Sequence, residues 1–362
     1  MLLYVYDASL NPLGVIENML SMLWKRRFRE PGEFAMEVPY SAEARELLAT
    51  GNLVMQPGGN EAMEIDYIRF SRNQQDMDTI QVQGRSLMQW LERRVTASAV
   101  ESFGTLTPQA LLRNLVNQNA VNPSDVNRKL PLYYNNRAAY TQDTIDYQAD
   151  RWESLLDCVE ELLSVSGMGC RVLSDPTTKR HTIDFLESTN KVAGTADQCI
   201  FAVEFGTLGQ HDYTYSTQTL FNMAYIEGGD EITTSVGGSL TGLNRRETSF
   251  SYSDISLTWT DIDEVEHTQT EAQVRTKCQS RARSELARDH AVEQTFEGEA
   301  VTFSSALRYK EDYDLGDKVT CMATRWGVRA DVVITEVSEE YKNGRETVEL
   351  TFGDGRPTLK LR

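Results

Sequence analysis

The sequence predicts an α+β protein that is mainly β, with a β-rich block at each end of the chain and an α+β block between them. In the last fifty or so residues, apolar and polar side chains alternate in three successive runs, Val319–Ala323, Val328–Ile334 and Val348–Phe352. A period of two marks strands with one buried face. Residues 152–165 instead carry leucines at helical spacing. The C-terminal runs therefore indicate a small antiparallel barrel or sandwich, and the leucine-rich stretch indicates a helix in the middle of the chain.

Residues 1–98 are predicted to form a mostly β domain. Turn sequences such as Asn11–Gly14 and Pro31-Gly32 separate short alternating runs. The phase of the alternation changes after Tyr67, which indicates a β-bulge. Near the end of this domain, Ser86 is expected to cap a short helix.

Residues 99–200 are predicted to form an α+β middle domain. Thr107-Pro108 is a typical helix start, with threonine as the N-cap and proline in the first turn. Residues 119–148 are rich in Asn, Asp and Tyr and are expected to form a long surface loop. The helix at 152–165 is expected to end at Gly167 and to carry a β-hairpin packed against it.

The rest of the chain divides into three predicted parts. Residues 201–260 are a β segment that joins the C-terminal β domain, residues 261–299 are a helical segment, and residues 300–362 are the C-terminal β part. The helix expected at 270–288 has a thin apolar stripe, which favours a surface or a subunit contact. An Asn-Gly pair within Lys342–Arg345 is typical of a tight hairpin turn.

The overall composition excludes several classes of protein. At 362 residues the chain is long for a single core, so two to four domains are expected. The N-terminus lacks the features of a signal peptide, and no apolar run approaches the roughly 20 residues of a membrane span. Five widely spaced cysteines favour free thiols made in the cytoplasm. A net charge of −18 argues against a tight sheath around nucleic acid, which needs a basic surface.

A series of short motifs occurs in a characteristic order along the chain. The motifs are Trp24-x-Arg-Arg27, Glu30-Pro-Gly-Glu-Phe34, Gly84-Arg-Ser-Leu87, Leu91-x-Arg-Arg94, Trp152, Leu220-x-Asn-x-x-Tyr-x-x-Gly228 and Tyr313-Asp-Leu-Gly-Asp-x-Val319. Their order and spacing resemble those of the tail-hub, or baseplate-hub, proteins of long-tailed bacteriophages, in the branch often described as siphovirus tail proteins. The resemblance extends over essentially the whole chain.

The resemblance implies a homotrimer in which each subunit supplies two small antiparallel β-barrel domains, at residues 1–98 and 300–362, to a pseudo-six-fold ring. Such a ring adapts a six-fold tail tube to a three-fold tip and surrounds the DNA channel. The implied partners are the distal tail or tube ring protein, the tape-measure protein and tail-tip or spike proteins. DNA would pass without specific binding, and the chain would not insert into a membrane. The implied location is the virion tail tip, after synthesis in the host bacterial cytoplasm.

The motif positions supply the candidate structural and interface residues. They are Trp24, Arg26, Arg27, Pro31, Gly32, Phe34, Arg85, Arg94, Asn222, Asp314, Gly316 and Asp317. For the basic islands that contain Arg26 and Arg94, two interpretations stay open: solvated element faces, or pairing with acidic groups of a neighbouring subunit. Trp24 and Phe34 are expected in the core, with contact to a partner as the alternative.

No catalytic, cofactor or metal site is predicted. Asp312–Asp317 resembles a calcium loop, but it has Gly316 at the fifth position, where a ligand is needed, so a structural turn is expected. The acidic run Asp261–His267 is expected to be a solvated loop, with weak cation binding as the alternative. The four histidines are not at ligand spacing, and no nucleophile motif is present. The chain is therefore expected not to be an enzyme.

Two other functions are kept as alternatives to the structural hub. One is a tail-associated cell-wall hydrolase, which only scattered acidic residues suggest. The other is a receptor-binding or glycan-binding tail module, which aromatic pairs such as Tyr133-Tyr134 suggest. Under the hub hypothesis, the acidic excess is expected to line the channel and repel the passing DNA. The chain ends a few residues beyond Phe352, so no appended peptidase or glycosidase is expected.

Overall fold

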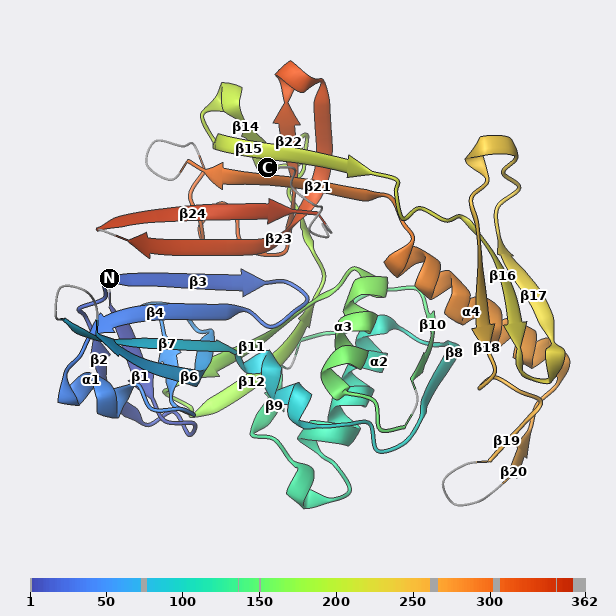
Figure 1. Ribbon diagram of the computed structural model, residues 1–362, viewed down its shortest axis with the longest axis horizontal. Helices are drawn as coiled ribbons and strands as arrows, with labels where there is room; N and C mark the ends of the chain where they lie inside the picture. Colours follow the sequence, from blue (N-terminus) through green and yellow to red (C-terminus); the bar gives the residue numbers. More distant parts are fainter. Residues whose placement is uncertain are drawn as a thin grey trace.

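Both ends of the chain contribute strands to one large β-sheet (Figure 1). The computed structural model describes residues 2–72, 77–135, 137–149, 151–260, 266–301, 307–342 and 344–353. In it, strand β23 pairs antiparallel with strand β3, from Glu336 opposite Arg27 to Lys342 opposite Ser21. Among the described residues, the strand pairings follow the open path β15-β21-β24-β23-β3-β4-β7-β6-β5-β1-β2. The prediction of a mainly β protein is confirmed.

The first strands and helices of the chain form what we call the N-terminal block. Its elements are β1 (Leu3–Tyr6), β2 (Pro12–Ile16), β3 (Ser21–Arg27), β4 (Glu33–Pro39), α1 (Ala42–Leu47), β5 (Leu53–Met55), β6 (Ala62–Arg72), β7 (Asp78–Ser86) and the 3₁₀ helix η1 (Leu87–Arg93). Alternate residues of β3 and β4 are buried, as the period-two pattern predicts. The predicted bulge is confirmed, because the register of β6 with β7 shifts between Ile65 and Tyr67.

The turn between β3 and β4 changes the expected role of Ser86. Pro31-Gly32 reverses the chain as predicted, and β3 and β4 pair antiparallel. The Ser86 hydroxyl does not cap η1; it accepts a hydrogen bond of 3.0 Å from the Gly32 N–H. The Ser86 N–H in turn donates to the Gly32 carbonyl at 2.8 Å. The hydroxyl is engaged by the turn because the Gly32 N–H has no strand partner and needs an acceptor.

What we call the middle block lies beside the N-terminal block in Figure 1. Its elements are β8 (Val100–Leu106), α2 (Pro108–Val116), the π-helical turn η2 (Asn117–Val121), η3 (Val126–Arg128), β9 (Leu132–Tyr134), β10 (Ile145–Ala149), α3 (Leu155–Ser166), β11 (Gly169–Asp175) and β12 (Arg180–Leu186). The predicted start of α2 is confirmed, because the Thr107 hydroxyl accepts from the Ala110 N–H. The predicted end of α3 is confirmed by the left-handed backbone of Gly167.

The expected surface loop at residues 119–148 is wrong in its first part. Helix α2 continues into η2, where Asn119, Ala120 and Val121 are buried. The Asn119 amide accepts a hydrogen bond of 2.8 Å from the Ala97 N–H and donates one of 2.9 Å to the Leu115 carbonyl. A polar residue is stable in a core when its hydrogen bonds are made there. The polar composition of this segment therefore did not indicate exposure.

A buried histidine joins the hairpin of the middle block to the N-terminal block. His181 on β12 is 3% exposed, and its Nε2 lies 3.1 Å from the carbonyl oxygen of Ala8. Because a carbonyl can only accept, Nε2 carries the proton and Nδ1 accepts from the Ser174 hydroxyl at 2.8 Å. This is the tautomer that the neutral ring adopts here. Burial lowers the pKa of His181 below its usual value of 6.5.

Acidification is expected to destabilise the protein in part through His181. Because the pKa is lower in the folded state, the unfolded chain binds a proton first as the pH falls. This contribution to stability is complete above about pH 6.5 and is lost as the pH falls toward the folded-state pKa. Thermal unfolding of wild type and His181→Gln measures it: the Tm advantage of wild type should shrink between about pH 7.5 and about pH 5.5. An advantage that is constant over this range would contradict the assignment.

What we call the side block packs a helix against a small sheet. Its elements are β16 (Met223–Gly228), η5 (Gly229–Glu231), β17 (Thr233–Gly237), η6 (Gly242–Asn244), β18 (Glu247–Tyr252), β19 (Thr258–Thr260), β20 (Glu266–Thr268) and α4 (Glu271–Asp289). The predicted helix is confirmed, but its thin stripe is not on a surface. Val274, Cys278 and Ala282 are fully buried against the β17-β16-β18 sheet. Small side chains at these positions allow the helix to approach the sheet closely.

What we call the C-terminal block completes the large sheet. Its elements are β13 (Thr189–Asn190), β14 (Ile200–Ala202), η4 (Val203–Phe205), β15 (Leu208–Ser216), β21 (Glu293–Ala300), β22 (Asp317–Ala323), η7 (Thr324–Trp326), β23 (Val328–Lys342) and β24 (Arg345–Phe352). The three predicted C-terminal strands are confirmed as an antiparallel set. Lys342 pairs with Arg345 across the predicted hairpin turn, where Gly344 has a φ of 74°. Asn343 lies outside the described residues.

Candidate functional site

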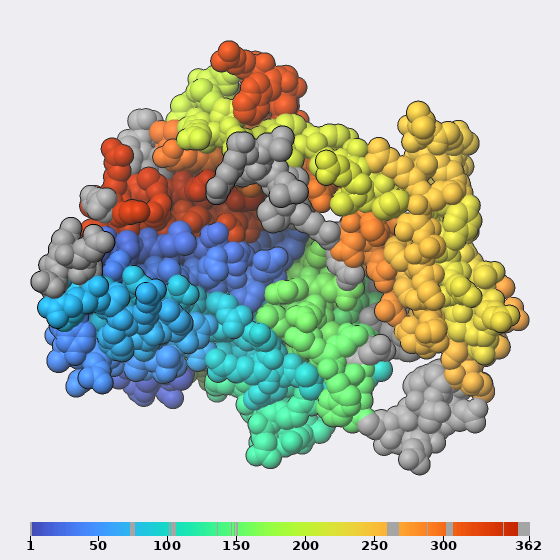
Figure 2. Space-filling view, viewed as in Figure 1, coloured from blue at the N-terminus to red at the C-terminus, as the bar shows by residue number. Residues whose placement is uncertain are grey.

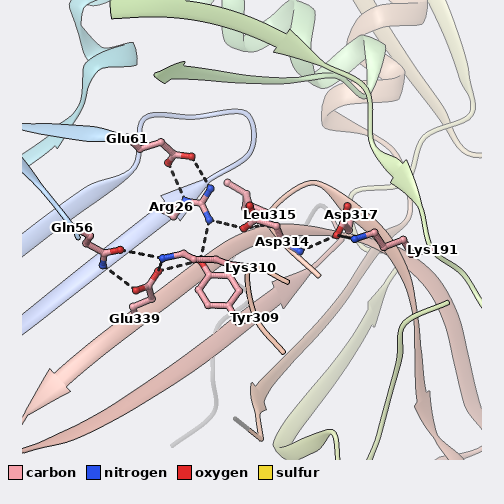
Figure 3. Close-up of polar contacts among 10 residues, drawn as sticks. All are labelled: Arg26, Gln56, Glu61, Lys191, Tyr309, Lys310, Asp314, Leu315, Asp317 and Glu339. Atoms are coloured by element: carbon pink, nitrogen blue, oxygen red, sulfur yellow. Dashed lines mark hydrogen bonds and ion pairs between the residues drawn. The ribbon is translucent and has the colours of Figure 1, made fainter. Parts of the chain in front are cut away.

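The N-terminal and C-terminal blocks meet along strands β3 and β23, and polar side chains form a connected network at this seam. Figure 3 shows the network on both sides of the seam, and Figure 2 shows the two blocks in continuous contact. What we call the Arg26 network consists of Arg26, Gln56, Glu61, Tyr309, Lys310, Asp314 and Glu339. Residues separated by almost the whole length of the chain are joined here.

Arg26 is the centre of the network. Its guanidinium donates from Nε and Nη2 to the two oxygens of Glu61, at 2.9 and 2.6 Å. Nη1 donates to the Tyr309 hydroxyl at 2.9 Å and to Asp314 Oδ1 at 2.6 Å. A planar guanidinium is suited to this fork geometry, which a lysine could not reproduce. Arg26 therefore connects the residue just before β6 in one block with the loop before β22 in the other.

The burial of Arg26 makes these contacts energetically important. Arg26 is only 8% exposed, because it follows Met22 and Trp24 on the inward face of β3. Burial by itself lowers the pKa of Arg26, but the Glu61 carboxylate raises the pKa well above its usual value. The side chain is thus charged and paired inside the protein. Neither interpretation left open by the sequence, solvated face or pairing with another subunit, describes this environment.

A second part of the network surrounds Glu339 on β23. Glu339 accepts hydrogen bonds from the Tyr309 hydroxyl at 3.0 Å, from Lys310 Nζ at 3.1 Å and from Gln56 Nε2 at 2.9 Å. Lys310 Nζ also donates to Gln56 Oε1 at 3.1 Å. Tyr309 bonds to both Arg26 and Glu339, so the two parts form one network. Linked polar groups of this kind favour one relative placement of the elements that carry them.

The loop that precedes β22 is a structural turn, as the sequence predicts. The Asp314 N–H donates to Asp317 Oδ2 at 2.8 Å, and the same oxygen lies 2.8 Å from Lys191 Nζ. Cations of the chain itself thus pair with Asp314 and with Asp317 of this turn. In the described part of the chain, no group of three or more His, Cys, Asp or Glu is placed to hold a metal ion. Most of the acidic run Asp261–His267, residues 261–265, lies outside the described residues.

Lys25 and Arg27 form a second set of ion pairs on the opposite face of β3. Arg27 pairs with Glu336 on β23 and Glu33 on β4, each at 2.8 Å. Lys25 lies 3.1 Å from Glu336 and 3.7 Å from Glu33. These side chains are about a quarter exposed, so each pair contributes less than a buried one. The seam is therefore ion-paired on both faces of the sheet.

Phe28 is the point where the two β blocks and the middle block meet. Its N–H donates to the Thr335 carbonyl at 2.9 Å, and its own carbonyl accepts from the Cys170 N–H at 2.8 Å. A Cβ added at Gly169 or Gly316 would lie 2.1 or 2.4 Å from the Phe28 ring. Gly316 also has a φ of +89°. Only glycine fits at these two positions, because the ring lies directly against their backbones.

These features join strands and loops of the two β blocks at the seam. A protein-family model described as Siphovirus ReqiPepy6 Gp37-like protein matches residues 2–354. The chain belongs to this Gp37-like family. The siphovirus resemblance expected from the order of the motifs is therefore confirmed. No curated protein sequence matches the Gp37-like chain.

Three solved structures share the fold of the Gp37-like chain over nearly their whole lengths. The 43 kDa tail protein of prophage MuSo2 from Shewanella oneidensis is 13% identical, with a TM-score of 0.59 and coverage of 97% of this chain and 98% of that one. A tail protein from Neisseria meningitidis MC58 is 11% identical, with a TM-score of 0.56 and coverage of 97% of this chain and 96% of that one. Prophage tail protein gp18 from Listeria monocytogenes EGD-e is 13% identical, with a TM-score of 0.55 and coverage of 99% of this chain and 95% of that one.

The remaining candidate residues of the Gp37-like chain lie in separate places. Trp24 and Phe34 are buried with ring centroids 5.9 Å apart. The Pro31 carbonyl accepts from Arg27 at 3.2 Å. Asn222 is in the side block, where its amide bonds to the Arg246 N–H and the Asn244 carbonyl.

Arg85 on β7 and Arg94, directly after η1, lie at the C-terminal end of the N-terminal block and differ in their partners. Arg85 is half-exposed and pairs with Asp66 and Glu92. Arg94 donates to main-chain carbonyls.

Within the part of the chain that the structure describes, no helix is long and apolar enough to span a membrane.

Sequence reasoning missed Phe28, Glu61 and Tyr309. Phe28 could have been found, because it continues the inward series Met22, Trp24 and Arg26 on β3. Glu61 and Tyr309 carry no local signal, since each lies at a turn or strand edge far from Arg26 in the sequence.

Proposed function

We propose that this Gp37-like chain is a structural protein of a phage or phage-like tail and forms a trimeric hub ring at the tail tip. The family match over residues 2–354 carries this proposal. The shared fold with three tail proteins, over at least 95% of each chain, supports it. The proposed role is mechanical, without catalysis by this chain.

The seam between the β blocks fits a ring-forming subunit. In the proposed ring, the N-terminal and C-terminal blocks act as two small barrel domains per subunit, so that three subunits supply six similar segments. Such a subunit needs a fixed angle between its two segments. The β3–β23 pairing, the buried Arg26 network and the Phe28 contacts favour a single angle.

The proposed partners follow from this location. The ring would contact the distal tail or tube ring protein, the tape-measure protein and tail-tip or spike proteins. DNA would pass through the channel without specific binding, because the net charge of −18 opposes contact with phosphates. The division of the chain into domains at residues 98, 200, 260 and 299 stays a prediction.

The copy number in purified particles tests this function. Quantitative mass spectrometry, normalised to packaged genomes, should give three copies of the chain per particle, because one three-fold ring closes the tail. Electron microscopy of particles that carry a labelled affinity tag on this chain should show the label at one end of the tail. Absence from particles, or copies on the order of tens spread along the tail, would contradict the hub.

A further inference from the structure

Arg94, which directly follows η1, and Arg128 of η3 line the same pocket on a chain that is strongly acidic. The pocket has a volume of about 350 Å³ and lies where η1 ends and the segment that contains η3 folds back. Its lining residues are Glu92, Arg93, Arg94, Val95, Asn127 and Arg128. The segment between α2 and β9 projects at the lower edge of Figure 1.

The arginines of this region fall into two kinds. Arg85 is paired with Asp66 and Glu92, and Arg93 is paired with the buried carboxylate of Glu64. Arg94 and Arg128 have no ion pair with any carboxylate among the described residues. Their positive charges are therefore not neutralised within this part of the chain.

Main-chain carbonyls hold Arg94 and Arg128 in place without neutralising them. Arg94 donates from Nε to the Arg128 carbonyl at 2.5 Å and from Nη1 to the Arg93 carbonyl at 2.7 Å. Arg128 donates from Nη2 to the Val95 carbonyl. The two side chains thus fix each other's segments and keep two like charges close together. Burial, and then the charges of Arg128 and Arg93, lower the pKa of Arg94.

Exposed apolar side chains border the pocket. Val95 is 37% exposed and Val126 is 73% exposed, and each is within two residues of one of the unpaired arginines. Trp152 lies in the adjoining segment, and its N–H donates a hydrogen bond to the Thr96 carbonyl. Its side chain is 59% exposed, and its backbone has a φ of 71°. A positive φ is rare for a bulky residue and costs free energy. Arginine and tryptophan with apolar neighbours are typical of protein interfaces.

We propose that Arg94 and Arg128 form a carboxylate-binding site for an acidic side chain of a second copy of this chain. A carboxylate presents two oxygens, which match the guanidinium N–H groups that have no acceptor among the described residues. A second copy offers such groups in excess, because the chain has 54 Asp and Glu against 36 Lys and Arg. The inference rests on the proposed homotrimer and specifies one contact within it.

The phosphate backbone of DNA would offer similar oxygens, but the rest of the molecule argues against it. Binding to DNA needs many basic contacts on one surface, whereas this site has two unpaired arginines on a chain with a net charge of −18. Complementary charges across a protein interface help to fix the orientation of a neighbour and do not require a basic surface of that extent.

The oligomeric mass of the full chain and its arginine variants tests this inference. We would measure light scattering over a concentration series at about 0.05 M and about 0.5 M salt, for wild type, Arg94→Gln, Arg128→Gln and the double variant. Arg85→Gln is the matched control, because its charge is already paired within the chain. The double variant should weaken trimer formation by at least about tenfold and lose most of the salt dependence, whereas Arg85→Gln should do neither. Equal Tm values of the separated monomers would show that the effect is on association.

Each other outcome overturns the inference in a distinguishable way. A trimeric wild type with an unaffected double variant removes the carboxylate site and leaves the hub in place. A wild type that stays at 41.0 kDa throughout the series removes both the trimer and the site. A short DNA duplex that binds wild type but not the double variant would identify phosphate as the ligand instead.

Discussion

Replacement of Arg26 by methionine is expected to cost about 3–5 kcal/mol of folding free energy, which is the typical effect of removing one partner from a buried ion pair. The loss arises because the Glu61 carboxylate, 16% exposed, loses its cation partner and both of the hydrogen bonds that the guanidinium donates to it. Tyr309 also loses its 2.9 Å hydrogen bond to the guanidinium. Asp314 is 40% exposed and can be hydrated, so it contributes less to the cost. Urea unfolding of wild type and variant measures the difference.

Two further variants make this result specific. Arg85→Met removes an arginine with half-exposed ion pairs and is expected to cost only about 0–1 kcal/mol. Arg26→Lys keeps a charge but cannot bond to Glu61 with two donors and also reach Tyr309 and Asp314, so an intermediate loss is expected. If Arg26→Met were no more costly than Arg85→Met, the Arg26 network would not hold the seam.

Replacement of Phe28 by alanine is expected to cost about 3–5 kcal/mol, because it leaves a cavity where three blocks meet. The ring is 3% exposed and lies against the backbones of Gly169 and Gly316. The loss of stability should appear in thermal and urea unfolding. Limited proteolysis should also show earlier cleavage between the blocks, because the contacts that join them are weakened.

A double-mutant cycle with Gly316→Ala separates this contact from general damage. Alone, Gly316→Ala is expected to destabilise strongly, since the new methyl group would lie 2.4 Å from Phe28 Cε2 at a φ of +89°. In the Phe28→Ala background the steric part of this cost should disappear, because the methyl group enters the cavity. Only the backbone part, on the order of 1–3 kcal/mol, should remain. Strictly additive costs would show that the two positions do not contact each other.

Local patterns in the sequence predicted most individual elements but not how the blocks join. Alternation identified β22, β23 and β24, and a threonine cap followed by proline located the start of α2. The pairing of β3 with β23 joins residues about 300 positions apart. Periodicity shows that a strand has a buried face, but it carries no information on which strand lies beside it.

The candidate site shows the same limit at the level of side chains. Arg26 and Asp314 were selected through a family resemblance, and the structure places them 2.6 Å apart. The place of Arg26 in the alternation of β3 indicates that its side chain is buried. It does not indicate which residues pair with that side chain, so Glu61 and Tyr309 could not be predicted. The polar segment after α2 was misjudged for a related reason. Asn119 is stable in the core because its amide makes hydrogen bonds to Ala97 and Leu115, which only the folded chain brings into place.

The solution mass of the purified chain tests the hub proposal most directly. Light scattering over a concentration series should converge on three times 41.0 kDa, because the proposed ring contains three subunits. A mass of 41.0 kDa throughout the series, or a final mass of two or four chains, would contradict a three-fold hub.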